Sequence, residues 1–251
     1  YPNFEEMKKY TGVVEARNFE VFRERLAKNG MLHQANDFFR ATGAHTVLQY
    51  KEVNESLLRT RNSGGFQLLG LADFPGQGSA FVGILDAFWE SKGLVTPEKF
   101  RESCAPTVLL ARLPKRTFRN GEKLKVKMEI YHFGKDALNS RKLNWTLTGE
   151  DGTVYHKGSL KTKSIQPATV DSLGIIELPL NGMDSARKLT LKAELGGIRN
   201  EWDVWVYPEQ PKTEQHNFVY TRTWNDETKQ WLNEGKNVLL IPEKCKGRKA
   251  H

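Results

Sequence analysis

The chain has 251 residues, of which 27% are charged and 38% hydrophobic, a composition typical of globular proteins. This length allows one to two domains, each with its own core. The most apolar stretch, at 80–89, contains Asp86 and is followed by Glu90, so no run reaches the roughly 20 residues of a membrane helix. The sequence therefore predicts no membrane span.

The net charge is +8, which raises the possibility of a polyanionic partner such as nucleic acid or an acidic polysaccharide. Most lysines, however, alternate with apolar residues, as at 123–128, which is typical of the solvated face of a sheet. Only Lys244, Lys246, Arg248 and Lys249 are clustered. We therefore favour a solvated surface and expect no nucleic-acid partner.

The first 60 residues have the signals of helices. Asn3 can cap a short helix, and Phe19, Phe22 and Leu26 recur at a spacing of three and four residues, which predicts one buried helical stripe. Two further helices are predicted, at about 32–42 and 45–59.

The stretch 64–78 combines a short apolar run with polar and turn-forming residues. The run 66–71 is too short for a helix and has the length of a buried parallel strand. Asp73, Phe74 and Gln77 follow at its carboxyl end, which is where ligands bind in barrels and open α/β sheets. These three residues are the candidate ligand contacts.

Three interpretations of this stretch compete. A dinucleotide-binding fingerprint is poorly matched, because Pro75 interrupts the tight turn and Phe81 stands where glycine or alanine is needed. A core strand with a tight exit loop, in which Asp73 caps a turn, is the simplest structural alternative. The third interpretation is the last strand of a (β/α)8 barrel, with the loop facing a substrate.

The stretch 64–78 and its continuation to residue 89 resemble the closing strand and following loop of glycoside hydrolase family 2, whose members are β-galactosidase-like enzymes. Three upstream segments are similar to helices late in that family's barrel. They are 1–4, 18–23 and 50–52. The resemblance covers about residues 1–115 closely and the remainder in domain order only.

This resemblance implies a hydrolase of carbohydrate metabolism that cleaves β-glycosidic bonds with retention. One carboxylic acid protonates the leaving oxygen while a second carboxylate, about 5 Å away, attacks the anomeric carbon. In the family both groups are glutamates on barrel strands that would precede Tyr1. The chain is therefore expected to be a fragment that lacks the catalytic residues and, alone, to be inactive.

The resemblance also fixes the expected partners. They are a carbohydrate substrate, contacted by Asp73, Phe74 and Gln77, and missing domains of a parent chain, with no cofactor and no metal. Galactose specificity is not implied, because leucines replace the tryptophans of β-galactosidase at 68, 69 and 71. Localisation is not fixed by the sequence, although carbohydrate-degrading relatives imply a secreted or periplasmic protein.

After residue 96 the pattern of apolar residues changes. Thr96 and Pro97 are a strong helix start, and 105–106 marks a domain boundary. From 107 to 207 apolar residues alternate with polar ones in about seven runs, the size of an immunoglobulin-like sandwich. Trp145 is the expected core tryptophan. Turn signals separate the runs, at 120–121, 150–152, 181–182 and 196–197.

The last stretch, 209–251, reads as a linker followed by a strand, a helix capped by Asn225 and a second strand. The predicted fold is thus multidomain α/β plus all-β. Its domains are the final portion of a (β/α)8 barrel, an immunoglobulin-like β-sandwich and the opening βαβ of a further α/β domain, at 1–105, 106–208 and 209–251.

A function of another class remains open. The sandwich could be a noncatalytic carbohydrate-binding or protein-interaction module, in which Tyr131, Tyr155 or Trp202 forms a flat aromatic platform for sugar rings. The six histidines show no metal-ligand spacing, and no nucleophile elbow or Walker-type loop is present.

Overall fold

The computed structural model describes residues 1–13, 15–74, 81–139, 141–209 and 218–242. The chain divides into two compact units, Tyr1–Pro208 and Glu209–His251, which we describe separately. No helix in these described ranges is both long and apolar enough to cross a membrane.

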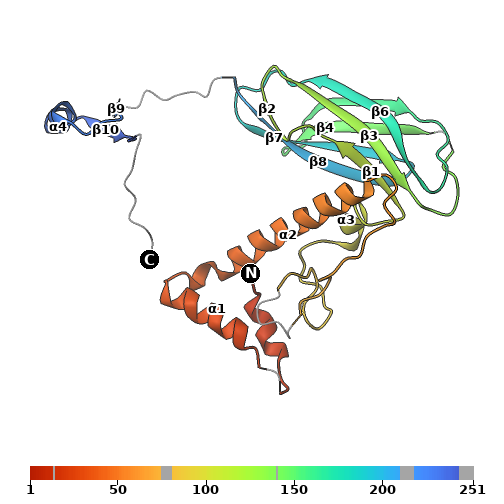
Figure 1. The fold of residues 1–251 in the computed structure, drawn as a ribbon, viewed down its shortest axis with the longest axis horizontal. Helices are drawn as coiled ribbons and strands as arrows, with labels where there is room; N and C mark the ends of the chain where they lie inside the picture. Colours follow the sequence, from red (N-terminus) through yellow and green to blue (C-terminus); the bar gives the residue numbers. More distant parts are fainter. Residues whose placement is uncertain (14, 75–80, 140, 210–217, 243–251) are drawn as a thin grey trace. The chain divides into compact units, whose positions relative to one another are not determined.

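The first unit begins with helices (Figure 1). They are η1 (Phe4–Lys9), α1 (Arg17–Lys28), η2 (Leu32–Gln34) and α2 (Ala35–Leu58), with the short α3 (Pro97–Arg101) further along. The predicted caps are confirmed, since Asn3 accepts a hydrogen bond from the backbone N–H of Glu5 and Thr96 accepts one from Lys99. Phe19 is buried on α1, as its spacing predicts.

Helix α2 is one continuous helix of 24 residues rather than the two predicted. Gly43 lies in its middle, where a break was expected. A Cβ at this position would lie 2.3 Å from Cδ2 of Leu94, so glycine here serves close packing of a loop against the helix.

The described residues form ten strands, eight of them in the first unit. Two sheets have the orders β1-β3-β6 and β2-β8-β7-β4-β5. All neighbouring pairs are antiparallel except β2 with β8. The strands are β1 (Thr107–Arg112), β2 (Thr117–Arg119), β3 (Lys123–His132), β4 (Lys142–Gly149), β5 (Val154–Lys161), β6 (Thr169–Pro179), β7 (Arg187–Leu195) and β8 (Ile198–Tyr207).

The inner faces of the two sheets form the main hydrophobic core. The alternation in β3 places Leu124, Val126 and Met128 in this core and the intervening lysines outside. The core tryptophan is Trp202 and not Trp145 as expected, because Trp202 is buried whereas Trp145 only packs against the cluster from its edge. The sandwich therefore has its own core, as a stable β unit requires.

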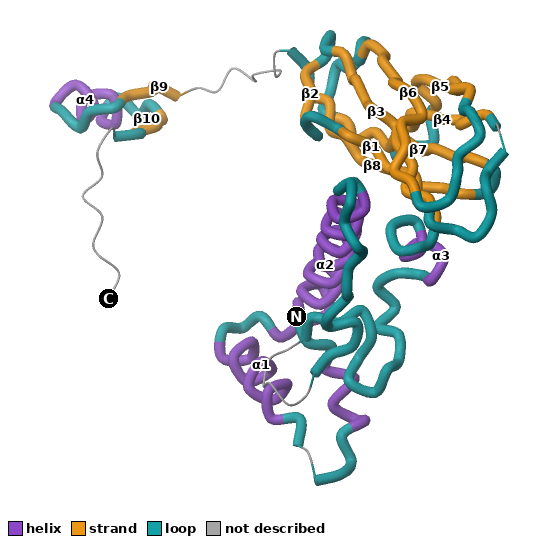
Figure 2. The backbone as a smooth tube through the Cα atoms, turned by 45° about the vertical axis from the view of Figure 1, so that its right-hand side comes forward, coloured by secondary structure: helices purple, strands orange, loops and turns teal. Residues whose placement is uncertain are grey.

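The expected fold class is wrong for the segment before the sandwich. Run 66–71 is not a strand, and the described residues before Thr107 contain helices, loops and isolated bridges only. Figure 2 draws the segment between α2 and α3 as loop. Two glycines explain the failure, since Gly65 and Gly70 have φ of +117° and +84° and interrupt an extended run. The structure is mostly β-sheet with a helical N-terminal segment, and its described residues form no portion of a (β/α)8 barrel.

The second unit contains β9 (Phe218–Thr221), α4 (Asp226–Asn233) and β10 (Asn237–Leu240). The two strands pair in parallel, with the helix between them in the sequence. Asn225 caps α4 by accepting a hydrogen bond from the backbone N–H of Thr228, as its sequence position predicts.

Candidate functional site

The predicted ligand contacts differ in exposure. Asp73 is buried, and the neighbouring Phe74 is 56% exposed. Gln77 lies outside the described residues. Backbone hydrogen bonds hold this segment beside Leu85, because the N–H of Asp73 donates to Leu85 and Leu85 donates to Leu71. The structure thus presents an aromatic ring from a segment that is anchored at its buried neighbour.

One hydrogen bond and one ion pair hold the Asp73 carboxylate inside the protein, and its Oδ2 accepts no hydrogen bond of good geometry from the described residues. One oxygen accepts a hydrogen bond of 2.9 Å from the backbone N–H of Gly83, and the other pairs with Nζ of Lys92 at 2.6 Å. Lys92 also donates to the carbonyl of Gly83 over 2.9 Å. Burial raises the pKa of Asp73, although the charge of Lys92 opposes this shift. The buried pair therefore serves first to hold two segments together.

Gly83 is required at this contact. A Cβ there would lie 2.4 Å from the carbonyl carbon of Ala72, 2.5 Å from the nitrogen of Asp73 and 2.6 Å from the oxygen of Leu85. Because backbone atoms cannot yield as a flexible side chain can, any larger residue would push the two segments apart.

Glu6 is a second buried carboxyl in the same electrostatic environment. Its pKa is raised to about 7, mainly by burial, while the charge of Lys92 opposes the shift and the charges of Asp73 and Asp86 add to it. Its Oε1 atom has no hydrogen-bond partner in the described part of the chain. A carboxyl of this kind exchanges a proton near neutral pH, which is the property of a general acid or base.

A tight loop at Asp86 presents a second exposed ring. One Asp86 oxygen accepts hydrogen bonds from the backbone N–H groups of Phe88 and Glu90, at 2.8 and 2.9 Å. Nζ of Lys9 pairs with both Asp86 and Glu90. Between them Trp89 has a φ of +65° and is 70% exposed. A left-handed backbone under an exposed tryptophan costs free energy, and such strain is concentrated at functional positions.

Sequence reasoning did not identify Glu6, Lys92 or Trp89 as functional candidates. Glu6 looks like an ordinary acidic residue in a first helical turn, and its burial depends on contacts that are distant in sequence. Trp89 had a usable signal, because aspartate often organises a tight turn by accepting backbone N–H groups two residues on. Asp86, with Phe88 and Trp89 two and three residues further on, fits that pattern.

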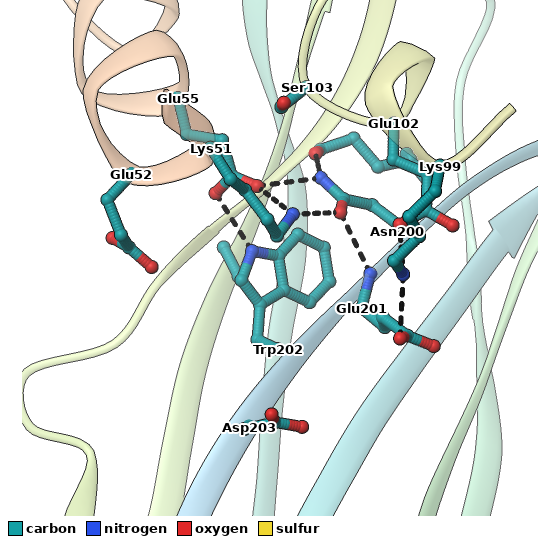
Figure 3. Close-up of polar contacts among 12 residues, drawn as sticks. Lys51, Glu52, Glu55, Lys99, Glu102, Ser103, Asn200, Glu201, Trp202 and Asp203 are labelled. Carbon is teal, nitrogen blue, oxygen red and sulfur yellow. Dashed lines mark hydrogen bonds and ion pairs between the residues drawn. The ribbon is translucent and has the colours of Figure 1, made fainter. Parts of the chain in front are cut away.

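A further polar group joins α2 to the sandwich, and we call it the Glu55 cluster. It comprises Lys51 and Glu55 of α2, Arg59 at the C-cap of that helix, and Asn200 and Trp202 of β8. Figure 3 shows Lys51, Glu55, Asn200 and Trp202. Glu55 is completely buried, and each of the other four side chains donates to its carboxylate. All of its hydrogen-bonding capacity is used within the protein, so we interpret the Glu55 cluster as a structural joint.

The three aromatic residues considered for a sugar platform do not act together. Trp202 is buried in the Glu55 cluster, and Tyr155 is packed against the sandwich core. Tyr131 is partly exposed and stacks on Phe133 with ring centroids 4.5 Å apart. Burial therefore excludes Trp202 as a ligand contact, whereas Tyr131 and Tyr155 are both partly exposed.

Comparison with protein families gives one match. The model described as Domain of unknown function (DUF8488) matches residues 122–208, most of the sandwich. No curated protein matches the chain.

Solved structures resemble parts of the chain at low identity. Spo0M, a sporulation control protein from Bacillus subtilis, is 15% identical over 43% of this chain and 51% of its own, with a TM-score of 0.33. The Escherichia coli alpha-2-macroglobulin is 16% identical over 45% of this chain and 8% of its own, also at 0.33. A putative beta-galactosidase from Bacteroides fragilis is 12% identical over 39% and 15%, at 0.29. This chain thus spans about half of Spo0M and smaller parts of the other two.

Proposed function

We propose that this chain is a noncatalytic, substrate-contacting portion of a glycoside hydrolase that acts on β-linked carbohydrate by a retaining mechanism. The proposal is supported by the resemblance of residues 64–89 to glycoside hydrolase family 2 and by the geometry of that same stretch. It assigns no catalytic glutamate to this chain and requires no metal or cofactor.

The observation that carries the proposal is the exposed ring of Phe74 beside the buried Asp73–Lys92 ion pair. A pyranose has an apolar face of C–H groups, which packs favourably on an aromatic ring. The ring binds better when its backbone is already fixed, because less conformational entropy is lost on binding. The ion pair and the Gly83 contact provide this rigidity.

The roles within the predicted triplet follow from exposure. Phe74 is the direct sugar contact. Asp73 holds Phe74 in position and reaches a sugar hydroxyl only where its ion pair with Lys92 opens. Gln77 supplies an amide that can donate to and accept from hydroxyl groups. Trp89 offers a second exposed ring, from the turn at Asp86 later in the same stretch of sequence.

Calorimetric titration tests this assignment. The probes are cellobiose, lactose and gentiobiose, three β-linked disaccharides, added to wild type, Phe74→Ala and Leu69→Ala. Leu69 is the matched control because it is an exposed apolar side chain in the same stretch. We expect wild type to bind at least one disaccharide, and Phe74→Ala alone to weaken that binding at least fivefold. Unchanged affinity in Phe74→Ala, or no binding of any probe, would reject the proposal.

A further inference from the structure

A hollow lies in the surface where the turn after α2 meets the sandwich. Its volume is about 280 Å³, and its walls come from three parts of the sequence. The turn contributes Arg61 and Asn62, the end of β3 contributes Tyr131, and the residue after β3 is Phe133. Ala168 comes directly before β6. We call it the Phe133 hollow. Its lining contains no residue of 71–74, which we call the Phe74 segment.

One wall of the Phe133 hollow is aromatic and apolar. Tyr131 and Phe133 are stacked with an angle of 19° between their rings, and Phe133 is 47% exposed. Leu58 and Phe66 lie behind them, packed with a small apolar cluster under the sandwich. These apolar residues pack behind the two rings and hold them in place. The exposed part of the rings therefore has a fixed position before a ligand binds.

The remaining lining of the hollow includes polar side chains and one positive charge. It carries the hydroxyl of Ser63, the amide of Asn62 and the guanidinium of Arg61. Arg61 forms no hydrogen bond or ion pair with the described residues. This guanidinium has five N–H donors and a fixed positive charge, so a carboxylate is its natural partner.

Backbone strain is located at two points on the rim. Asn62 and Ala168, both lining residues, have φ of +62° and +60°. Asparagine tolerates this conformation, but in alanine it brings Cβ close to the following carbonyl oxygen and is strained. Nothing in the hydrogen bonding of Ala168 compensates for this cost within the described residues. Strain of this kind is typical of ligand sites.

From these observations we propose that the Phe133 hollow binds one acidic sugar residue, a hexuronate. A hexuronate has an apolar ring face for the aromatic wall, hydroxyl groups for Asn62 and Ser63, and a carboxylate for Arg61. A neutral sugar would leave the guanidinium without an anionic partner, and an aliphatic acid would leave the aromatic wall without a flat partner. The volume suits a single pyranose. This inference does not depend on the Phe74 segment or on catalysis.

Ligand-observed NMR and calorimetry with two matched probes test this site. The probes are methyl β-D-glucuronide and methyl β-D-glucoside, which differ in one carboxylate. The variants are Phe133→Ala and Arg61→Gln, with Arg23→Gln as the control because Arg23 is an exposed arginine of α1 that undergoes the same loss of charge. Thermal melts first establish that each variant is folded, and Phe74→Ala is titrated in parallel.

We expect wild type to bind the glucuronide at least fivefold more tightly than the glucoside. Arg61→Gln should remove this preference, Phe133→Ala should weaken glucuronide binding at least fivefold, and Arg23→Gln and Phe74→Ala should change neither. Equal binding of the two probes by wild type, or an undiminished preference in folded Arg61→Gln, would overturn the proposal. If Phe74→Ala lost glucuronide binding and Phe133→Ala kept it, the sugar would bind at the Phe74 segment. This result would also overturn the proposal.

Discussion

The indole N–H of Trp202 donates a hydrogen bond of 2.8 Å to Oε2 of Glu55, joining strand β8 to helix α2. Asn200 approaches the other oxygen at 2.9 Å, while Lys51 and Arg59 supply two positive charges. Because a buried carboxylate is tolerable only when it is paired and hydrogen-bonded, these contacts set the register of the helix against the sandwich.

The Glu55 cluster gives a prediction about stability. Glu55→Ala should lower the free energy of unfolding by about 3–5 kcal/mol, because it leaves two cations and two N–H donors without their acceptor. Urea denaturation followed by tryptophan fluorescence measures this loss. Glu52→Ala is the control, since Glu52 forms an exposed pair with Arg116 that is worth about 0–1 kcal/mol. A loss below 1 kcal/mol in Glu55→Ala would show that the joint is not structural.

We predict that Asp73 and Lys92 contribute to the stability of the protein mainly as a pair. Asp73→Ala should destabilise the protein by about 3–5 kcal/mol, because it leaves a buried ammonium unpaired. The double variant Asp73→Asn with Lys92→Met should recover much of this loss. Thermal melting of the single and double variants measures the coupling.

The same variants separate two roles of Asp73. If Asp73 contacts sugar directly, folded Asp73→Asn binds β-linked disaccharides more weakly by roughly tenfold to a hundredfold, which corresponds to about 1–3 kcal/mol. If it serves only as an anchor, affinity per folded molecule stays unchanged while the melting temperature falls. Our account predicts a large stability loss and a smaller effect on affinity than that of Phe74→Ala.

Glu6 predicts a specific dependence of stability on pH. Its pKa is raised from 4.5 in the unfolded chain to about 7, so the folded protein binds its proton more tightly. The resulting stabilisation is complete below pH 4.5 and is lost as the pH rises through about 7. Glu6→Gln removes this dependence. From pH 4 to pH 8 the stability of wild type relative to Glu6→Gln should therefore fall by about 1–3 kcal/mol.

Chemical denaturation at pH 4, 6 and 8 provides this measurement. Glu5→Gln is the matched control, because Glu5 is an exposed neighbour that pairs with Lys8 at the surface. The burial of the Glu6 carboxyl would be contradicted if the stability of wild type relative to Glu6→Gln did not change with pH. It would also be contradicted if the stability of wild type relative to Glu5→Gln changed with pH by the same amount.

The sandwich should fold without the preceding segment. Its core cluster is drawn entirely from residues between 109 and 206, so 106–208 keeps this cluster when separated, although Val108 and Leu110 lose their contacts with the preceding segment. We expect a cooperative thermal transition for 106–208 and a broad or absent one for 1–105. Limited proteolysis of the full chain tests the same point. Early loss of the sandwich with a protected 1–105 piece would contradict the prediction.

Local patterns predicted the parts of the fold that depend on local chemistry. The alternation of Leu124 with lysines predicted β3, and Asn3 and Thr96 predicted helix starts, because each signal acts within a few residues. Helix α2 was divided wrongly at Gly43, since the close approach of Leu94 is not visible in the sequence. The run 66–71 was predicted as a strand, but a strand requires a paired neighbour, and sequence alone does not supply one.

The candidate site shows the same division. Phe74 was predicted as a ligand contact from its place after an apolar run, whereas Lys92 was not considered because its pairing with Asp73 spans the intervening loop. The burial of Glu55 on α2 was also not predicted, because it depends on donors that β8 provides for its carboxylate.

The most direct test of the proposed function is to map where a β-linked disaccharide contacts the folded chain. Amide chemical-shift changes in a two-dimensional NMR titration with cellobiose, lactose or gentiobiose provide this map. The account predicts that the largest changes occur at 71–74 and 83–92, around Phe74 and the Asp73–Lys92 pair, and that they disappear in Phe74→Ala. Changes confined to other residues, or none with any of the three disaccharides, would contradict a substrate-contacting role for this segment.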